Sequence, residues 1–248
     1  MNNRNSRNRI YISKEEQDLI KNTPIVLGGA GIGSNIAECL LRLGFETITI
    51  IDGDVVELSN LNRQNYTEKD ITKSKVEAIK ERLLAINNKA KITIHDCFLT
   101  SDNIEEFISD HKIAINALDF TSDAPALFDL TCQKKNIPIL HPYNLGWASL
   151  VLVISEKEKL NSLEKSDEEF SDLTVVNYVT DYMRYSGNPQ EWLENIVMKY
   201  KSEEEVLSPP QLCVASWLVA AVCTNIAFDI ATNMPIKLFP DFYFTSVK

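Results

Sequence analysis

The chain has 248 residues, of which 44% are hydrophobic and 24% are charged, with only 8 Gly and 9 Pro. This composition excludes collagen-like and wholly disordered proteins and indicates a globular protein with a sizeable core. The net charge is -10 at pH 7, which repels phosphate groups and disfavours general binding to nucleic acid or to an anionic membrane.

The first predicted elements form a strand, a glycine turn, a helix and a second strand. Residues 1–22 are expected to form an N-terminal arm with a helix. The apolar run Ile25–Leu27 then leads into glycines, Ser34–Leu43 has helical spacing, and Thr47–Ile51 is rich in β-branched residues. From strand to strand the segment has about 30 residues, the usual length of one right-handed parallel βαβ unit.

Helices and strands continue to alternate as far as residue 154. Apolar residues recur at helical spacing over Lys73–Ile86, and further runs predict a helix at Ala126–Lys135 and strands at Ile92–Ile94, Ile113–Ile115, Ile137–Leu140 and Leu150–Ile154. This alternation predicts an α/β fold of the Rossmann-like, doubly wound type, with a mainly parallel sheet and helices on both faces. Residues 23–154 would form its core.

Residues 155–210 differ in character and are interpreted as an insertion. The segment 156–172 is charged and short of large apolar residues, whereas Gln190–Lys201 has the spacing of a helix. Tyr178, Tyr182 and Tyr185 also fall at helical spacing, which is more typical of packing than of a ligand site. The insertion is either a solvated loop with a surface helix or a lid that docks a partner.

Residues 211–248 are expected to be a C-terminal helix and tail that complete a single domain over residues 1–248. The apolar run 214–231 contains Asn225 and Asp229, which would be costly in lipid, so it predicts a buried helix and no membrane span. Residues 1–9 lack the apolar stretch of a secretory signal, and the five cysteines include no CxxC pair. Together these features favour a reduced, cytoplasmic location.

A turn of small residues follows the first strand and opens the first helix, and it contains Gly28, Gly29, Ala30, Gly31 and Gly33. Backbone N–H groups and the helix dipole can face phosphate at such a turn. Asp52, at the end of the second strand, can accept hydrogen bonds from both ribose hydroxyls of a nucleotide. Up to this point the sequence fits a nicotinamide-binding protein equally well.

The segment after the second strand separates these possibilities. It has the sequence D-G-D-V-V-E-L-S-N-L-N-R-Q over residues 52–64, and D-I-T-K-S-K follows over residues 70–75. These motifs resemble the ThiF/MoeB/HesA group of ubiquitin-activating-enzyme-like adenylyltransferases, whose members carry D-x-D, S-N-L-N-R-Q and D-x-G-x-x-K after a nucleotide-binding glycine turn. Nicotinamide dehydrogenases do not ordinarily place these polar residues directly after the ribose carboxylate.

The resemblance implies a site for ATP and Mg²⁺. In it Asp52 would bind ribose, Lys75 would contact phosphate during transfer, and the remaining nucleotide-binding residues would be Asp54, Asn60, Arg63 and Gln64. Arg as a planar fork and Lys as a point charge suit a triphosphate, although a lone Arg or Lys more often forms a surface ion pair. Asp119 matches the Mg²⁺-binding aspartate of the family. Alternatively Asp119 caps the following helix, and Asp123 competes for either role.

Arg9 and His141 have two interpretations each. Arg9 resembles the N-terminal arginine that family members insert into the nucleotide site of a neighbouring subunit, but it also fits an exposed basic tail. His141 ends a predicted strand near the expected approach of the acceptor, where a structural histidine is the more usual case.

The sequence departs from the family pattern at three points. Ala30 replaces a glycine of the turn, Thr72 replaces the glycine before Lys75, and the paired CxxC zinc site of many members is missing, so no zinc is expected. No thioester is expected either, because Cys213 and Cys223 lie in the apolar run, where thiols are usually inert core residues.

The resemblance therefore implies a homodimeric adenylyltransferase that uses ATP and Mg²⁺ to convert a carboxylate into an acyl-adenylate. The implied acceptor is the C-terminal carboxylate of a ubiquitin-like or sulfur-carrier protein, or of a peptide, whereas nucleic acid is disfavoured by the net charge. Two alternatives remain. A non-catalytic subunit of a heterodimer would fit Ala30, Thr72 and the weak Arg9 motif, and a nicotinamide oxidoreductase would explain only the glycine turn and Asp52.

Overall fold

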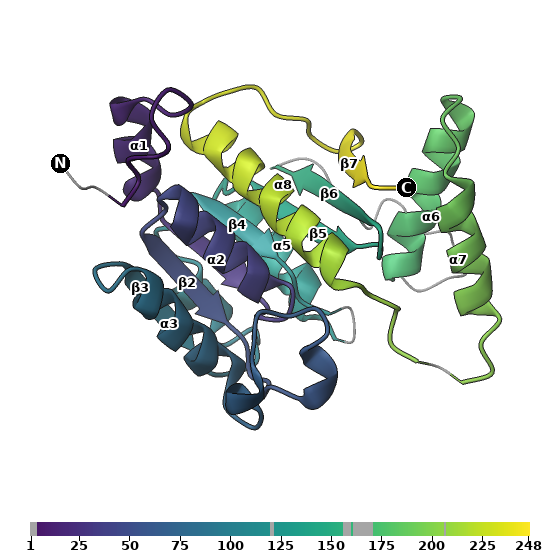
Figure 1. Cartoon of the computed structure of the whole chain (residues 1–248), viewed down its shortest axis with the longest axis horizontal. Helices are drawn as coiled ribbons and strands as arrows, with labels where there is room; N and C mark the ends of the chain where they lie inside the picture. Colours follow the sequence, from purple (N-terminus) through teal and green to yellow (C-terminus); the bar gives the residue numbers. More distant parts are fainter. Residues whose placement is uncertain (1–3, 120–121, 156–159, 161–170, 206) are drawn as a thin grey trace.

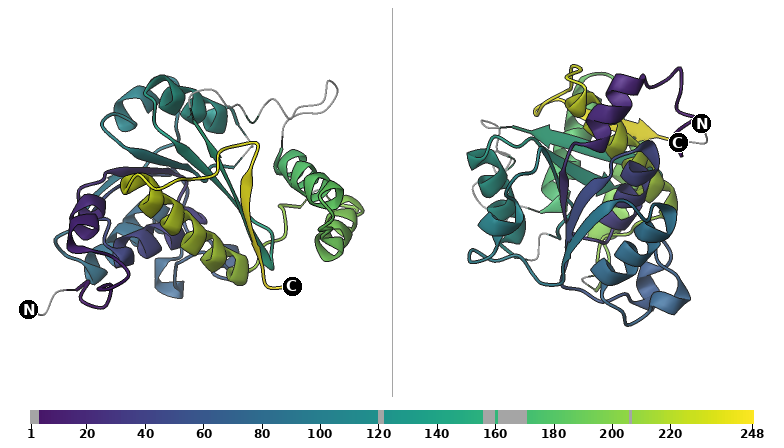
Figure 2. Two further views of the ribbon diagram at one scale, coloured as in Figure 1. Left: turned by 90° about the horizontal axis from the view of Figure 1, so that it is seen from above. Right: turned by 90° about the vertical axis from the view of Figure 1, so that its left-hand side faces the viewer.

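The computed structural model describes residues 4–119, 122–155, 160, 171–205 and 207–248. Its centre is a seven-stranded sheet in the order β3-β2-β1-β4-β5-β6-β7, with helices on both faces (Figures 1 and 2). The strands are β1 (Ile25–Gly28), β2 (Thr47–Ile51), β3 (Lys91–His95), β4 (Ile113–Asn116), β5 (Ile139–Asn144), β6 (Ala148–Ile154) and β7 (Phe242–Ser246). This architecture confirms the predicted Rossmann-like α/β fold.

The strands from β3 to β5 are parallel, and the chain changes its direction of winding between β1 and β4. β1 pairs with β2 on one side and with β4 on the other. The chain runs from β1 through β2 to β3 at one edge of the sheet and then crosses to β4 on the other side of β1. In open α/β sheets, ligands bind at the carboxyl ends of the strands at such a switch point. The loops after β1, β2 and β4 are therefore where a binding site is expected.

Two layers of helices bury the two faces of the sheet in separate hydrophobic cores. α2 (Gly33–Leu43), α3 (Lys75–Ile86) and α8 (Cys213–Ala231) pack on one face, while α4 (Ile104–Phe107) and α5 (Ala124–Lys134) pack on the other. Eight of the eleven residues of α2 are buried, among them Ile36, Leu40 and Leu41, because this helix packs against α8 and α3 as well as against the sheet. α1 (Lys14–Lys21) adds Ile20 to the first core.

The insertion contains two helices, α6 (Asp172–Tyr185) and α7 (Glu191–Lys201), which lie side by side beyond β6 (Figure 1). α7 confirms the helix predicted at Gln190–Lys201, whereas a solvated loop with a single surface helix is too simple a description. The Tyr178 ring lies 5.8 Å from that of Phe239, so packing is confirmed there, but Tyr185 is 98% exposed. Most of the predicted charged loop at 156–172 lies outside the described residues.

The C-terminal segment contains a helix and, in addition, a strand that the sequence analysis did not predict. β6 pairs antiparallel with β5, and β7 pairs antiparallel with β6, which extends the parallel sheet by two strands. Among the described residues, one helix, α8, has the length and the apolar composition that would allow it to cross a membrane. In this fold α8 packs against α2, β5 and β6, as predicted for a buried core helix.

Candidate functional site

The glycine turn passes directly against the end of β4. Gly29 has a φ of 92°, and a Cβ atom there would lie 2.2 Å from the carbonyl oxygen of Ala117, so no larger residue fits without movement of the backbone. A Cβ atom on Gly31 would lie 3.2 Å from Nε2 of Gln64. The turn therefore brings the N-terminus of α2, with its partial positive charge, close to the loops after β2 and β4.

Asp52, directly after β2, is held by the backbone on both sides of its carboxylate. Oδ2 accepts a hydrogen bond from the N–H of Ala30 at 2.6 Å, and Oδ1 accepts one from the N–H of Asp54 at 2.8 Å. Burial raises the pKa of Asp52, while the charge of Lys75 and the two backbone hydrogen bonds oppose that shift. Each carboxylate oxygen retains a free lone pair, so this fixed group can still accept hydrogen bonds from a ligand.

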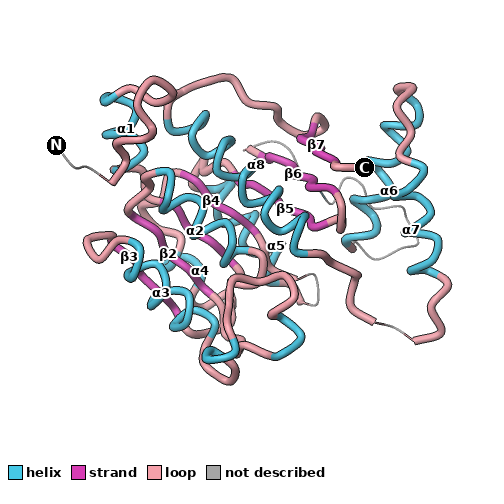
Figure 3. The backbone as a smooth tube through the Cα atoms, in the orientation of Figure 1, coloured by secondary structure: helices cyan, strands magenta, loops and turns pink. Residues whose placement is uncertain are grey.

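Lys75 stands at the first position of α3 and forms an ion pair across the site. Its Nζ lies 2.8 Å from Oδ2 of Asp54, and its side chain is only 9% exposed. A short antiparallel bridge between Val55 and Ser74 holds the two segments together, and the N–H of Lys75 donates to the carbonyl of Asp54 at 2.9 Å. The long connection between β2 and α3, mostly loop in Figure 3, thus presents a nearly buried ammonium group.

Arg63, from the same connection, is oriented by three acceptors. Its Nε donates to Oε1 of Gln211 at 2.6 Å, and its Nη1 donates to the carbonyl of Ser59 at 2.9 Å and to Oδ1 of Asn62 at 2.8 Å. Burial lowers the pKa of Arg63, and the negative charge of Asp119 opposes this shift, so guanidinium and carboxylate act on one another across the site.

These side chains surround a first cavity of about 490 Å³. Eight of the predicted nucleotide-site residues line it: Gly29, Gly31, Asp52, Asp54, Arg63, Gln64, Lys75 and Asp119. The volume lies within the ~300–1,000 Å³ typical of ligand pockets. A triphosphate nucleotide with the ribose at Asp52 therefore has both space and two cations within one cavity.

Four other predicted residues, Gly28, Ala30, Gly33 and Asn60, do not line this cavity and support it instead. Ala30 is fully buried, and its carbonyl accepts a hydrogen bond from the Tyr66 hydroxyl at 2.7 Å. Asn60 is 8% exposed, and its Oδ1 accepts a hydrogen bond from the N–H of Glu57 at 3.0 Å, which fixes the turn that leads to Arg63. The predicted contacts of these four residues with a nucleotide stay a prediction.

The structure does not bring Arg9 to the cavity of its own chain. Arg9 is exposed and donates to the carbonyl of Ser6 at 3.0 Å, and Asn8 donates to the carbonyl of Leu43 at 2.9 Å, at the end of α2. The glycine turn lies at the opposite end of this 11-residue helix, about 15 Å away at 1.5 Å per residue.

Several lining residues were missed by sequence reasoning, notably Phe98, Leu99, Ser122 and Gln211. Phe98 follows β3 and is 68% exposed. It nevertheless packs closely against Gly53, because a Cβ atom on Gly53 would lie 2.9 Å from the Phe98 ring. The available signal was an aromatic residue shortly after the strand predicted at Ile92–Ile94. Gln211 carried no local signal, because its position depends on the path of the chain after α7.

Asp119 does not cap the helix that follows it, since Asp123 occupies the N-cap position of α5. Within the described residues, no group of three His, Cys, Asp or Glu side chains is arranged to hold a metal ion. An Mg²⁺ ion at Asp119 would therefore need phosphate or water oxygens for its other ligands, which is how Mg²⁺ usually binds beside nucleotides.

Comparison with known proteins identifies the chain. A model of the ThiF family matches residues 4–234. The chain belongs to the ThiF family. This membership confirms the resemblance inferred from the motifs at residues 52–64 and 70–75.

The relatives of this ThiF-family chain are named for different activities. It is 34% identical over 134 residues to the tRNA threonylcarbamoyladenosine dehydratase of Escherichia coli (strain K12), covering 53% of this chain and 50% of that protein. It is also 34% identical over 160 residues to the sulfur carrier protein ThiS adenylyltransferase of Bacillus subtilis (strain 168), covering 62% of this chain and 47% of that protein. The chain thus spans about half the length of these relatives.

A solved structure of E. coli MccB with ATP has the same fold. It matches with a TM-score of 0.70 at 20% identity, over 99% of this chain and 71% of that chain. At this identity the likeness extends to the fold alone.

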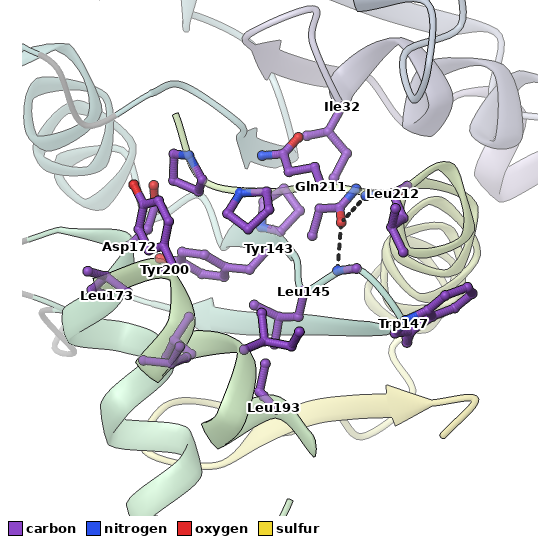
Figure 4. A pocket seen from close by; sticks show the side chains of 18 of the residues that line it. Ile32, Tyr143, Leu145, Trp147, Asp172, Leu173, Leu193, Tyr200, Gln211 and Leu212 are labelled. Atoms are coloured by element: carbon purple, nitrogen blue, oxygen red, sulfur yellow. Dashed lines mark hydrogen bonds between the residues drawn. The ribbon is translucent and has the colours of Figure 1, made fainter. Parts of the chain in front are cut away.

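A second cavity of about 310 Å³ adjoins the first in this ThiF-family chain. It lies between the loops after β4 and β5 and the helices α6 and α7 (Figure 4). Five residues line both cavities: Ile32, Ala117, Leu118, Asp119 and Gln211. His141 also lines the second cavity; it is 1% exposed, and its Nε2 lies 3.1 Å from Oδ1 of Asp129.

The two cysteines of α8 differ in exposure. Cys223 is buried, and burial raises its pKa, as expected of an inert core thiol. Cys213 is exposed at the start of the helix, so the prediction that it lies in the core was wrong. The reason is that Cys213 lies on the solvent side of the first turn of α8, in which Ala215 and Ser216 are the buried residues.

Proposed function

We propose that the chain is an ATP-dependent adenylyltransferase that activates a carboxylate as an acyl-adenylate and releases pyrophosphate. The observation that carries this proposal is the convergence of Arg63, Lys75, Asp52 and Asp119 on a single 490 Å³ cavity at the switch point of the sheet. Family membership supports the same chemistry. A nicotinamide oxidoreductase would leave the two cations and Asp119 without a role.

The nucleotide can be placed by the chemistry of the cavity lining. Asp52 would accept the ribose hydroxyls, and the exposed ring of Phe98 offers a surface on which adenine can stack. Arg63 and Lys75 would then neutralise the triphosphate, with Lys75 exchanging its contact with Asp54 for phosphate oxygens. Asp119 would hold Mg²⁺, which when bound offsets the negative charge of the phosphates.

The reaction requires no nucleophile from the protein. An ionised carboxylate oxygen of the acceptor attacks the α-phosphorus, a new O–P bond forms, and the bond to the β-phosphate oxygen breaks with its electron pair leaving on pyrophosphate. No proton is transferred. The chain contributes by aligning the two reactants and by stabilising the charge that builds up on the phosphates, which are the main sources of acceleration in phosphoryl transfer.

The acceptor in this proposal is the C-terminal carboxylate of a ubiquitin-like or sulfur-carrier protein, or of a peptide. Similarity to a sulfur carrier protein ThiS adenylyltransferase supports this choice. A tRNA acceptor is a second candidate, because another relative is named for a modified tRNA base. The net charge of -10 makes nucleic acid the less favourable partner.

Carboxylate-dependent exchange of pyrophosphate into ATP tests the function directly. We expect Arg63→Ala, Lys75→Ala and Asp119→Ala each to reduce exchange by about 100- to 1,000-fold, because each removes a group that stabilises transition-state charge. Lys73→Ala is the matched control, since Lys73 lies two residues away and pairs with Asp70 and Glu81 outside the cavity. Exchange at the wild-type rate in all three variants would contradict the site, whereas the absence of exchange in the wild-type protein would favour a non-catalytic subunit.

We also propose a homodimer in which Arg9 completes the site of the partner. The exposed arm lies at the far end of α2 from its own cavity, so any contact with nucleotide requires a second copy. Arg9→Ala and Asp119→Ala homodimers should both be inactive, but mixing them should restore activity, to about a quarter of wild type if the subunits of a symmetric dimer exchange freely. Full activity of the Arg9→Ala protein alone would rule out this role.

A further inference from the structure

The second cavity is continuous with the proposed nucleotide site. Asp119 and Gln211 belong to the lining of both cavities, and Gln211 also accepts the hydrogen bond from Arg63. A molecule in the second cavity can therefore place one end beside the α-phosphate of a nucleotide in the first. This continuity makes the second cavity the natural position for the part of the acceptor that adjoins the reacting carboxylate.

The lining of the second cavity is predominantly apolar and aromatic. Helix α7 contributes Trp192, Leu193 and Ile196, and the loop after β5 contributes Leu145 and Trp147 (Figure 4). None of its described lining residues is Lys or Arg. Such a surface favours the burial of apolar groups over anionic ones.

The same cavity also has polar lining residues, one of which, Asp119, is shared with the first cavity. The Tyr143 hydroxyl is buried and has no hydrogen-bond partner among the described residues, and Tyr143 itself is 6% exposed. Burial and the charge of Asp172 raise the pKa of Tyr143, and burial together with the charge of Asp119 raises the pKa of Asp172 to about 6. Tyr143, Asp172 and Asp119 all line this cavity and supply polar groups to it.

An unpaired buried hydroxyl is costly and is normally satisfied by a partner. A peptide backbone supplies such partners through its amide N–H and carbonyl groups. Asp172, at the first position of α6, can accept from an amide N–H in the same way. The cavity thus combines polar groups suited to a peptide backbone with an apolar surface suited to a side chain.

We propose that the second cavity selects a peptide acceptor that carries a bulky apolar side chain within one residue of the activated carboxylate. This inference rests on the proposed adenylyltransferase function. An acceptor that ends in two glycines would leave a cavity of about 310 Å³ unfilled and the apolar side chains of α7 uncovered. A leucine- or phenylalanine-sized side chain would bury that surface while its backbone contacts Tyr143 and Asp172.

The test compares three N-acetylated tetrapeptides, Gly-Gly-Gly-Gly, Gly-Gly-Leu-Gly and Gly-Gly-Gly-Leu, as acceptors in pyrophosphate exchange. Burial of one leucine side chain should favour at least one leucine peptide over tetraglycine by about 10- to 100-fold in kcat/KM. Ile196→Trp fills the cavity from α7 and should abolish this preference. Met198→Trp is the control, because Met198 is 60% exposed on the same helix and does not line the cavity.

Binding can be measured separately from catalysis. Two of the three tryptophans, Trp147 and Trp192, line the second cavity, so a leucine peptide should change the intrinsic fluorescence whereas tetraglycine should not. The titration is made with the wild-type protein and a non-hydrolysable ATP analogue.

The two measurements separate the possible failures. A fluorescence change on leucine peptide without exchange for any peptide would support the cavity and overturn the adenylyltransferase function. Equal exchange for tetraglycine and both leucine peptides, or an Ile196→Trp protein indistinguishable from Met198→Trp, would overturn the cavity assignment and leave the function standing. If no peptide supports exchange and no peptide changes the fluorescence, the proposal of a peptide acceptor is overturned.

Discussion

Arg63 and Gln211, which are 148 residues apart in the chain, are joined by a 2.6 Å hydrogen bond from Nε to Oε1. The backbone carbonyl of Gln211 also accepts a hydrogen bond from the side chain of Asn62 at 3.3 Å. These contacts tie the end of the insertion to the loop that carries the principal cation of the proposed site. The segment that separates α7 from α8 therefore has a direct influence on the guanidinium that would meet the triphosphate.

Gln211→Ala should lower kcat/KM for ATP in the exchange reaction by about 10- to 100-fold, because a hydrogen bond to a charged group is lost. We expect Gln211 to act by positioning Arg63, so the double variant Arg63→Ala/Gln211→Ala should be no worse than Arg63→Ala alone. If the fold-reductions in kcat/KM of the two single variants multiply in the double variant, the two residues act independently.

Phe98→Ala should weaken binding of a non-hydrolysable ATP analogue by about 5- to 100-fold, since stacking of a base on an aromatic ring contributes about 1–3 kcal/mol. Phe98→Tyr keeps an aromatic face and should retain nearly all of the affinity. Calorimetric titration measures both variants. Equal affinities for Phe98→Ala and the wild type would place the adenine elsewhere in the cavity.

The parts of this structure that the sequence predicts well are those encoded by local patterns. The strands Ile25–Gly28 and Thr47–Ile51, the helix Gly33–Leu43 and the turn between them have their hydrophobic and glycine signals within a few residues. The cavity residues at 52–75 follow from a continuous motif, so most of them were found in advance.

Features that depend on distant contacts escaped prediction. β7 contains the run Phe-Tyr-Phe without the alternation of a half-buried strand, and only its pairing with β6 fixes it as a strand. Gln211 enters the site because the chain returns from α7 across the first cavity. Arg9 is the opposite case: its local motif predicts a place in the site, but the length of α2 separates it from the cavity of its own chain.

Glu38 is a buried acid that links α2 to the elements around the site. It is 4% exposed, Asn65 donates to its Oε2 at 2.6 Å, and Arg42 donates to its Oε1 at 2.7 Å. Arg82 on α3 also contacts its Oε2. Burial alone would raise the pKa of Glu38, but the hydrogen bonds from these three side chains outweigh it and lower the pKa below its ordinary 4.5.

Glu38→Gln should therefore lower the free energy of unfolding by about 1–3 kcal/mol at pH 7. Because the folded-state pKa is depressed, the stabilisation by Glu38 is present above pH 4.5 and is lost as pH falls from there through the folded-state pKa. The difference between variant and wild type should then shrink in acid. Urea unfolding at several pH values measures it, with Glu46→Gln as the control for a more exposed ion pair. A difference that does not depend on pH would exclude the ionised carboxylate as its source.

Thr72 has a φ of 73°, and it occupies the position at which the family motif has glycine. A β-branched residue is strained in this left-handed region, whereas glycine adopts it freely. Thr72→Gly should relieve strain of about 1–3 kcal/mol and lose part of that gain to the greater freedom of the unfolded chain. We expect a net gain of about 1 kcal/mol and a rise in Tm of about 2–4 °C.

The same substitution at an ordinary strand position provides the comparison. Thr245 is exposed in β7, and Thr245→Gly should lower stability by about 0.5–1 kcal/mol, because glycine only adds unfolded-state entropy there. The Thr72 turn immediately precedes Lys75 and is fixed by a hydrogen bond of 2.9 Å from its N–H to the carbonyl of Val56. Thr72→Gly should therefore leave pyrophosphate exchange unchanged while raising Tm. A fall in Tm like that of Thr245→Gly would mean that the threonine side chain stabilises the turn by more than its backbone conformation costs.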